Sequence, residues 1–328
     1  MARRARPGEF ELIARYFAPL AKGFPGAAGL RNDNAVLSPP RGKQLLVKTD
    51  AIVAGVHFLA DDEPGLVARK ALRVNLSDIA AGGGKPLAYQ MALALPPRWT
   101  EAWVAAFCRG LAADQRKFGV HLCGGDTVAT PGPLTVSITL FGTVPSGRAM
   151  SRGGARNGDD IWVSGTIGDA ALGLLVARRK LAGMSHAHKR HLIARYRLPQ
   201  PRLDLAPLLR KLARASIDVS DGLAADLGHI CAQSRLGARI DVDAVPLSAP
   251  ARAALAQDRA LLARILGGGD DYEILFTAAP ARRQALAAAA RAIGIKLTRI
   301  GEMNDGRGVR MEWRARAIGL RHPGFAHF

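Results

Sequence analysis

The first half of the chain alternates segments that have strand-like and helix-like hydrophobic patterns. Apolar residues recur every second position in the strand-like segments and every third or fourth position in the helix-like ones. The predicted strands are 44–49, 87–95 and 134–144, and the predicted helices are 63–79 and 100–118. Thr100 is the expected N-cap of the second helix, and Asp50 is expected in a polar turn just after the first strand.

The second half begins after a stretch rich in glycine, proline and serine at 145–158, which predicts a domain boundary. We therefore expect two domains, 1–148 and 149–328. Strand-like and helix-like segments alternate again after it. The predicted strands are 160–164, 215–219, 238–243 and 273–277, and the predicted helices are 169–181, several between 186 and 214, and an alanine-rich surface helix within 278–292. This order predicts an α/β (α+β) fold.

Composition places the chain among globular proteins. It has 328 residues, of which 48% are hydrophobic and 22% charged, close to the average of folded domains. The best candidate for a membrane span, 161–177, is interrupted by three glycines and Asp169, so we expect no membrane segment. Three cysteines without a CxxC pair, and no apolar stretch behind the basic N-terminus, favour a reducing cytoplasm.

The net charge of +19 raises the question of a nucleic-acid partner. The 46 basic residues are spread along the chain, however, and only 5% of residues are aromatic, which leaves few rings for stacking on bases. A diffuse positive field also suits small anionic substrates. The charge pattern therefore favours small anions, with a basic nucleic-acid-binding protein as the alternative.

Aspartates recur in one context, just after an apolar segment and beside small or polar residues. They are Asp33, Asp50, Asp78, Asp126, Asp218 and Asp221. One such aspartate is more often a turn or cap residue. The repetition favours a site at which carboxylates hold Mg²⁺ ions and, through them, ATP phosphates. No P-loop is present, so ATP would be bound by another architecture.

Ordered motifs along nearly the whole chain strengthen this interpretation. They are TDAIVAGVHF (49–58), ARKALRVNLSDIAA (68–81), GGDT (124–127), SRGGARNGD (151–159), SIDVSDGLAADLGHI (216–230) and GGDDYEILFT (268–277). In this order they resemble the thiamine-monophosphate kinase family. That family belongs to the superfamily of aminoimidazole ribonucleotide synthetase and selenophosphate synthetase.

The resemblance implies an N-terminal domain that binds ATP and metal and forms a homodimer through its strands, and a C-terminal α+β domain. ATP and several Mg²⁺ ions would lie between the domains. The implied reaction is direct in-line transfer of a phosphoryl group from ATP to thiamine monophosphate, which gives thiamine diphosphate. A phosphate acceptor is largely ionised at neutral pH and needs no strong general base.

The resemblance also implies roles for individual residues. The implied metal ligands are Asp33, Thr49, Asp50, Asp78, Asp126, Asp218 and Asp221, of which Asp50, Asp126 and Asp218 are the expected catalytic residues. Gly125, Asp126, Arg152 and Ser220 would contact ATP. His57, Asp270 and Phe325 would contact thiamine monophosphate. Considered without the resemblance, a histidine in this context is more often a half-buried structural residue than a site residue.

Four positions depart from the family pattern. Arg31 and Asn32 stand where Gly-Asp is usual before Asp33, Lys48 replaces a small hydroxyl residue, and Asp270 replaces a glutamate. Strand alternation could turn Lys48 to the same face as Asp50. We then expect one outer Mg²⁺ site to be missing or weakened, with the ammonium partly standing in. The alternative is that Lys48 extends into solvent.

A sibling enzyme of the superfamily is the nearest rival function. Selenophosphate synthetase would need a reactive cysteine near the N-terminus, but the first cysteine is Cys108. The hydrogenase-maturation relative would end in a cysteine-containing tail, but the last cysteine is Cys231. Both observations favour thiamine-monophosphate kinase.

Overall fold

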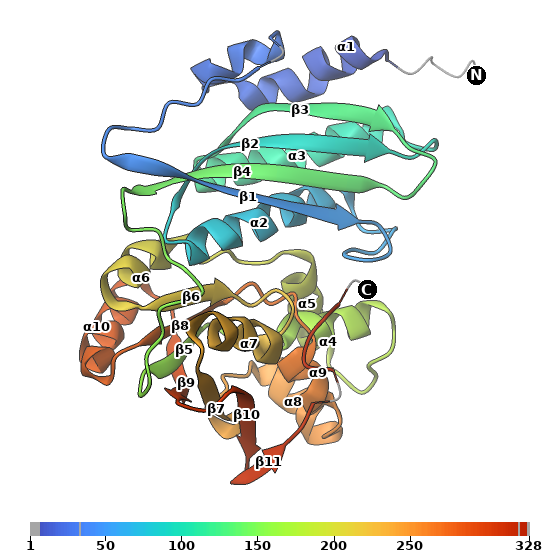
Figure 1. Ribbon diagram of the computed structural model, residues 1–328. Coiled ribbons are helices and arrows are strands. Elements are labelled where there is room, and N and C mark those ends of the chain that lie inside the picture. Colours follow the sequence, from blue (N-terminus) through green and yellow to red (C-terminus); the bar gives the residue numbers. More distant parts are fainter. Residues whose placement is uncertain (1–6, 33, 321, 327–328) are drawn as a thin grey trace. The chain divides into compact units, whose positions relative to one another are not determined.

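A computed structural model describes residues 7–32, 34–320 and 322–326 of the chain (Figure 1). The chain divides into two compact units. The first unit comprises residues 1–79 and 84–147, and the second comprises residues 80–83 and 148–328. The described residues include no helix with both the length and the hydrophobicity to cross a membrane.

The first unit is built on a sheet with the strand order β1-β4-β2-β3. Its strands are β1 (Lys43–Val53), β2 (Lys85–Leu95), β3 (His121–Ala129) and β4 (Thr135–Pro145). β4 is antiparallel to both β1 and β2, and β3 is parallel to β2. The connection between the parallel strands is a helix, as parallel pairing requires.

Helices α2 (Pro64–Ala81) and α3 (Glu101–Phe118) cover one face of this sheet (Figure 1). β4 buries Val136, Ile138 and Leu140, every second residue, as expected for a strand with one covered face. The predicted N-cap is confirmed, because the Thr100 hydroxyl accepts the backbone N–H of Trp103 at 3.1 Å. Short helical turns precede the sheet: α1 (Glu9–Leu12), η1 (Ile13–Phe17), η2 (Ala18–Ala21) and η3 (Pro25–Leu30).

A buried ion pair joins the two covering helices. Arg73 on α2 donates from Nε to Asp114 Oδ2 on α3 at 2.5 Å and from a terminal nitrogen to Oδ1 at 2.9 Å, and both side chains are fully buried. Arg69 adds a third bond to Oδ1 at 3.0 Å. Two cations facing one carboxylate compensate for the cost of removing its charge from water.

The second unit contains a larger sheet with the order β11-β10-β7-β9-β5-β8-β6. Its strands are β5 (Asp160–Ser164), β6 (Ala215–Asp218), β7 (Gly237–Asp241), β8 (Ile274–Ala278), β9 (Leu297–Asn304), β10 (Gly308–Trp313) and β11 (Arg316–Ile318). Its helices are α4 (Asp169–Ala177), α5 (His186–Arg197), α6 (Ala206–Leu212), α7 (Leu223–Ser234), α8 (Ala249–Gln257), α9 (Leu261–Gly267) and α10 (Arg283–Ile293), with one-turn segments η4 (Leu203–Leu205), η5 (Val242–Ala244) and η6 (Pro280–Arg282). The pairs are antiparallel except for β10 with β7.

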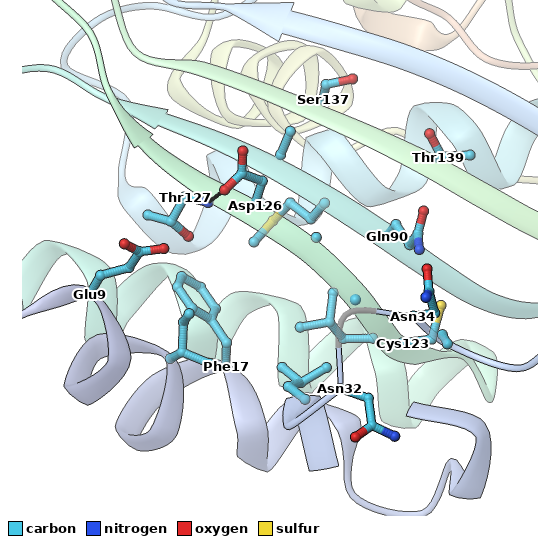
Figure 2. A pocket seen from close by; sticks show the side chains of 18 residues that line it. Glu9, Phe17, Asn32, Asn34, Gln90, Cys123, Asp126, Thr127, Ser137 and Thr139 are labelled. Atoms are coloured by element: carbon cyan, nitrogen blue, oxygen red, sulfur yellow. Dashed lines mark hydrogen bonds between the residues drawn. The ribbon is translucent and has the colours of Figure 1, made fainter. Parts of the chain in front are cut away.

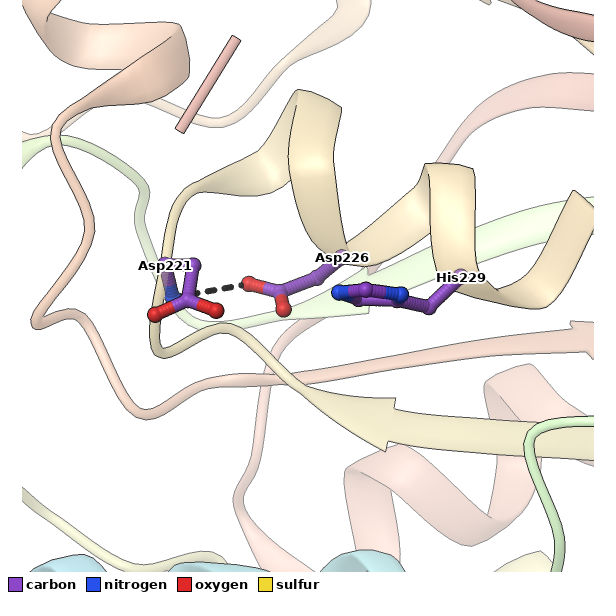
Figure 3. A group of neighbouring side chains, drawn as sticks. All are labelled: Asp221, Asp226 and His229. Carbon is purple, nitrogen blue, oxygen red and sulfur yellow. Dashed lines mark hydrogen bonds between the residues drawn. The ribbon is translucent and has the colours of Figure 1, made fainter. Parts of the chain in front are cut away.

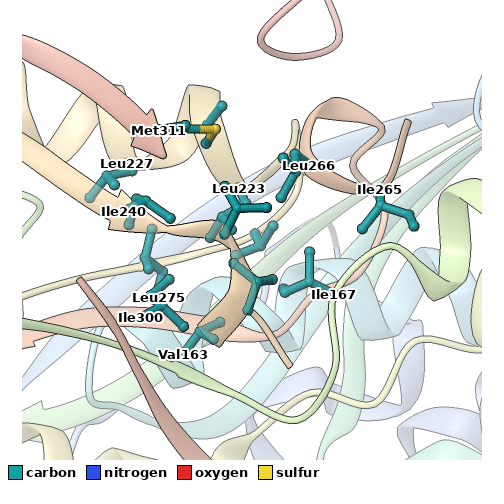
Figure 4. Close-up of a cluster of buried hydrophobic side chains, with 14 of the residues drawn as sticks. Val163, Ile167, Leu223, Leu227, Ile240, Ile265, Leu266, Leu275, Ile300 and Met311 are labelled. Carbon is teal, nitrogen blue, oxygen red and sulfur yellow. The ribbon is translucent and has the colours of Figure 1, made fainter. Parts of the chain in front are cut away.

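Both faces of this sheet are buried at β5, β6 and β8. Val163 and Leu275 belong to the main core, which includes residues of α4, α7 and α9 (Figure 4). Their neighbours Trp162 and Phe276 point to the other face and pack with residues of α6 and α10. Strands buried on both faces have continuous hydrophobic sequences, which explains why β5 and β8 are recognisable in the sequence.

Several sequence expectations about individual elements were wrong. Asp50 lies inside β1, which pairs with β4 as far as Val53, and not in a turn after it. The GGDT motif at 124–127 lies inside β3, which was not predicted because paired glycines weaken a strand pattern. The helix predicted at 169–181 ends at Ala177. β9, β10 and β11 were also not predicted.

Replacing Asp114 with alanine should destabilise the first unit by about 3–5 kcal/mol, since it leaves Arg73 buried without its carboxylate. Urea denaturation followed by circular dichroism measures the change. Arg310→Ala, which removes a surface ion pair to Glu312, is the control and should leave the midpoint nearly unchanged. Equal midpoints for the two variants would contradict the proposed contribution of the buried pair.

Candidate functional site

One group of candidate residues lies where β1 approaches α2. Lys48 and Asp50 are two positions apart on β1 and therefore point to the same face. The Lys48 Nζ atom lies 3.1 Å from Asp50 Oδ1 and 3.2 Å from Asp78 Oδ2, near the end of α2. The expected proximity of Lys48 to Asp50 is thus confirmed. Partial burial lowers the pKa of Lys48, but the charges of Asp78 and Asp50 outweigh it and raise the pKa above its ordinary value.

The backbone of Asp50 is fixed by the same helix. Its N–H donates to Asn75 Oδ1 on α2 at 3.0 Å, and the Asn75 amide nitrogen donates in turn to the Ala71 carbonyl. Asn75 is fully buried. An edge-strand N–H is therefore satisfied by a buried side chain, which holds the Asp50 carboxylate at a defined position beside α2.

A second group lies on the opposite face of the sheet. Thr49, next to Asp50, points away from α2, and its hydroxyl lies 2.8 Å from that of Thr139. Thr139 lines a pocket of about 400 Å³ that also contains Asp126, Asn32 and Asn34 (Figure 2). Within the described part of the first unit, Thr49 and Asp126 thus lie on the other face from Asp50 and Asp78. Asp33, between Asn32 and Asn34, lies outside the described residues.

Gly125 in the pocket cannot be replaced by a larger residue without distortion. Its φ is +150°, and a Cβ atom there would lie 2.0 Å from the Met91 carbonyl oxygen. The next residue, Asp126, is exposed and accepts the Thr127 N–H at 2.8 Å. The glycine leaves backbone accessible beside a carboxylate, an arrangement that permits close approach of a ligand.

His57 lies just beyond β1 and stabilises the turn that follows it. Its Nδ1 accepts the Val53 N–H at 3.1 Å, and its carbonyl accepts a bond from the Lys70 ammonium at 2.8 Å. Lys70 is almost completely buried. His57 therefore has a structural role in the turn after β1.

The second unit holds the other candidate carboxylates in one loop. Asp226 Oδ2, near the start of α7, accepts the backbone N–H groups of Ser220, Asp221 and Gly222 at 3.0, 3.1 and 3.1 Å. Figure 3 shows Asp226 between Asp221 and His229, and ligand atoms of these three residues lie within 4.8 Å of one another. The loop from 218 to 222 is thus anchored on one buried carboxylate.

Crowding of negative charge perturbs this carboxylate. Burial and the charges of Asp218 and Asp221 raise the pKa of Asp226 to about 8, although the backbone N–H groups act in the opposite direction. Asp218 is itself buried at the end of β6. Such a group of acids has the ligand chemistry of a site for a hard divalent cation.

Two distant segments reach the same loop. The Asp270 N–H donates to the Ser220 carbonyl at 2.8 Å, and the Phe325 N–H donates to the Asp221 carbonyl at 3.0 Å. Gly269, which has a φ of +70°, could not carry a Cβ because it would lie 2.3 Å from the Ser220 carbonyl oxygen. The fold therefore brings Ser220, Asp221, Asp270 and Phe325 together.

Buried polar and ionic contacts fix the residues that follow Asp270 in the chain. Asp271 accepts the N–H groups of Gly168 and Ala170 at the start of α4. Glu273 is fully buried and pairs with Arg195 at 2.9 Å and Arg202 at 2.5 Å. The segment that carries Asp270 is consequently held in place by its buried neighbours Asp271 and Glu273.

Comparison with known proteins identifies the family. Residues 31–144 match the N-terminal domain of AIR synthase related proteins, and residues 156–314 match their C-terminal domain. Thiamine-monophosphate kinase from Caulobacter vibrioides is 43% identical over 98% of this chain and 92% of its own length. The chain belongs to the thiamine-monophosphate kinase family.

Solved structures of the family agree with this assignment. The crystal structure of thiamine-monophosphate kinase from Stenotrophomonas maltophilia K279a has a TM-score of 0.80 and 43% identity, and the alignment covers 88% of this chain and 91% of that one. AaThiL complexed with AMPPCP and TMP has a TM-score of 0.78 and 30% identity over 99% of both chains.

Two residues that shape this site, Asp226 and His229, were not predicted from the sequence, although both lie within the 216–230 motif. An acid in the first turn of a helix that begins after a glycine is a recognisable anchor for backbone N–H groups.

Arg152, a predicted ATP contact, is exposed, and the carbonyl of the preceding Ser151 accepts the Ser216 N–H of β6.

Replacing Asp226 with alanine should cost about 3 kcal/mol, because three backbone donors lose their shared carboxyl acceptor. Asp226→Asn keeps a side-chain oxygen as acceptor and places no charge near Asp218 and Asp221, so it should be much closer to the wild type. Denaturation curves and amide exchange at 220–222 measure both effects. If the alanine variant kept wild-type exchange at these amides, Asp226 would not be the anchor of the loop.

Proposed function

We propose that this chain transfers the terminal phosphoryl group of ATP to thiamine monophosphate and so produces thiamine diphosphate. The observation that carries the proposal is the convergence of Ser220, Asp221, Asp270 and Phe325 from three segments of a chain that belongs to this kinase family. Its alignment over full length with a relative that binds AMPPCP and TMP gives further support.

The chemistry requires charge neutralisation more than proton removal. The attacking group is a phosphate oxygen with a second pKa of about 6, so most of it is already ionised at pH 7. The barrier arises from bringing two anions together in line. Because the acceptor phosphate can attack without prior activation, direct transfer is the mechanism that fits these Asp-rich motifs.

Magnesium is the cofactor that fits these residues. Asp50, Asp78 and Asp126 with Thr49 in the first unit, and Asp218 and Asp221 in the second, offer the oxygen ligands that Mg²⁺ prefers. Bound Mg²⁺ would neutralise phosphate charge during transfer. Asp226 holds the 218–222 loop so that Asp218 and Asp221 keep their positions. Asp33 completes the proposed set.

The remaining candidates divide between the two substrates. Gly125 offers accessible backbone for ATP phosphates, with Asp126, Arg152 and Ser220 as further contacts. The substrate thiamine monophosphate contains a cationic thiazolium ring. Phe325, whose side chain is 48% exposed, presents an aromatic face, and Asp270 presents a carboxylate, and both complement a cation. His57 is proposed as a third contact.

We further propose a homodimer in the reducing cytoplasm. β1 is an edge strand of its sheet, and on the sheet of the first unit Val47 and Val128 are 60% and 46% exposed. An exposed edge strand with apolar side chains favours pairing with a second chain.

The state of the cysteines supports the proposed reducing compartment. The three cysteines are buried and unpaired, and burial raises the pKa of Cys108 to about 12.

The decisive test is incubation with ATP, Mg²⁺ and thiamine monophosphate, followed by chromatography for thiamine diphosphate. Asp50→Asn and Asp126→Asn should each lower turnover by about two orders of magnitude or more, equivalent to about 3 kcal/mol of transition-state stabilisation. Asp258→Asn is the control, since this exposed side chain accepts the Ala260 N–H and an asparagine oxygen can do the same. No product with wild-type protein would overturn the function, and wild-type turnover in both site variants would overturn their roles.

Direct transfer predicts that no phosphorylated enzyme accumulates. The protein is incubated with γ-labelled ATP and Mg²⁺ without acceptor, denatured, and examined for covalent label. We expect only background incorporation, while thiamine monophosphate added to a parallel sample becomes labelled. Stoichiometric label on the protein would instead establish a covalent intermediate.

A further inference from the structure

Lys48 places a cation beside two of the proposed metal ligands of the first unit. Its ammonium contacts carboxylates from two different elements, Asp50 on β1 and Asp78 on α2. The side chains of Lys48 and Asp50 are 31% and 33% exposed, and that of Asp78 is 19% exposed. The three charges are therefore only partly screened by water, and their interaction is stronger than that of a surface pair.

The geometry is that of a bridge. The two carboxylate oxygens can be no farther apart than the sum of their distances from Nζ, so one positive charge links both acids. A strand fixes Lys48 and Asp50 on a common face, and the Asn75 bond to the Asp50 backbone keeps β1 against α2. The ammonium is thus held in place by the same contacts that position the acids.

We propose that the Lys48 ammonium acts as a built-in cation between Asp50 and Asp78. A divalent ion shared by these two carboxylates consequently binds weakly or not at all. The inference deepens the proposed function, because it takes Asp50 and Asp78 as metal ligands. A Mg²⁺ ion binds oxygen at about 2.0–2.1 Å. An ion at that distance from both carboxylates would encounter the ammonium within a few ångströms, where like charges repel strongly.

This arrangement has a functional consequence for Lys48 as a positioning residue. The positive charge beside Asp50 and Asp78 remains when the Mg²⁺ concentration falls, whereas a bound ion would dissociate. Part of the charge needed near the phosphates is then independent of free metal. Activity should consequently depend on fewer Mg²⁺ ions than in a variant without the ammonium.

Counting bound Mn²⁺ tests the inference without relying on activity. Full-length protein is titrated with Mn²⁺ in the presence of AMPPCP, and free Mn²⁺ is measured by electron paramagnetic resonance. Lys48→Ser and Lys48→Met both remove the charge, and the methionine variant keeps most of the aliphatic stem. We expect each to bind one additional Mn²⁺ per chain, or to bind the weakest ion at least tenfold more tightly.

Two matched variants retain the proposed bridge. Lys48→Arg keeps a cation between the acids, and Lys43→Ser removes an exposed lysine from the start of the same strand. Both should bind Mn²⁺ as the wild type does. The double variant Lys48→Ser with Asp50→Asn should lose the additional ion, because one of its ligands is gone.

Thermal unfolding provides a second readout. Without Lys48 the two carboxylates repel each other, so Mn²⁺ should raise the melting temperature of Lys48→Met more than that of the wild type. Identical Mn²⁺ stoichiometry and affinity in the wild type and both neutral variants would overturn the inference. Failure of the proposed function would appear separately, as absence of thiamine diphosphate in the assay of the wild type.

Discussion

Neutralisation of buried carboxylates is the constraint on which this structure depends. Asp114 requires Arg73 to join the helices that cover the first sheet, and Glu273 requires Arg202 beneath the loop cluster of the second unit. Asp226 is stabilised by backbone N–H groups instead. Some of the arginines therefore have an internal role, since they compensate acids that could not otherwise leave water.

The fold could be predicted from the sequence where burial is simple. β5 and β8 have both faces covered and show continuous hydrophobic runs, and the helix that begins after Thr100 has a clear cap. β3 was not predicted because its second half, with Gly124 and Gly125, is largely exposed and carries no alternation. β1 is longer than expected because its pairing with β4 continues through Asp50 as far as Val53.

The sequence motifs indicated the candidate site residues, but most of the spatial arrangement of these residues could not be predicted. The proximity of Lys48 and Asp50 followed from the two-residue period of a strand. Because of the same period, Thr49 points to the other face of the sheet. The meeting of Asp270 and Phe325 at one loop depends on backbone bonds between distant segments. No local pattern encodes these bonds between distant segments. Asp226 is different, because it anchors the loop through bonds to residues only four to six positions away, and its place in the first turn of α7 is a local signal that was overlooked.

The backbone around Asp270 has a further consequence. Asp270 and Tyr272 adopt positive φ values of +66° and +51°, on either side of the buried Asp271. Left-handed geometry is costly for most side chains but less so for aspartate. A segment held in this way by bonds to Ser220 and Gly168 has lost its conformational freedom during folding. For a ligand that contacts this segment, the binding surface is already preorganised, so binding costs little additional conformational entropy.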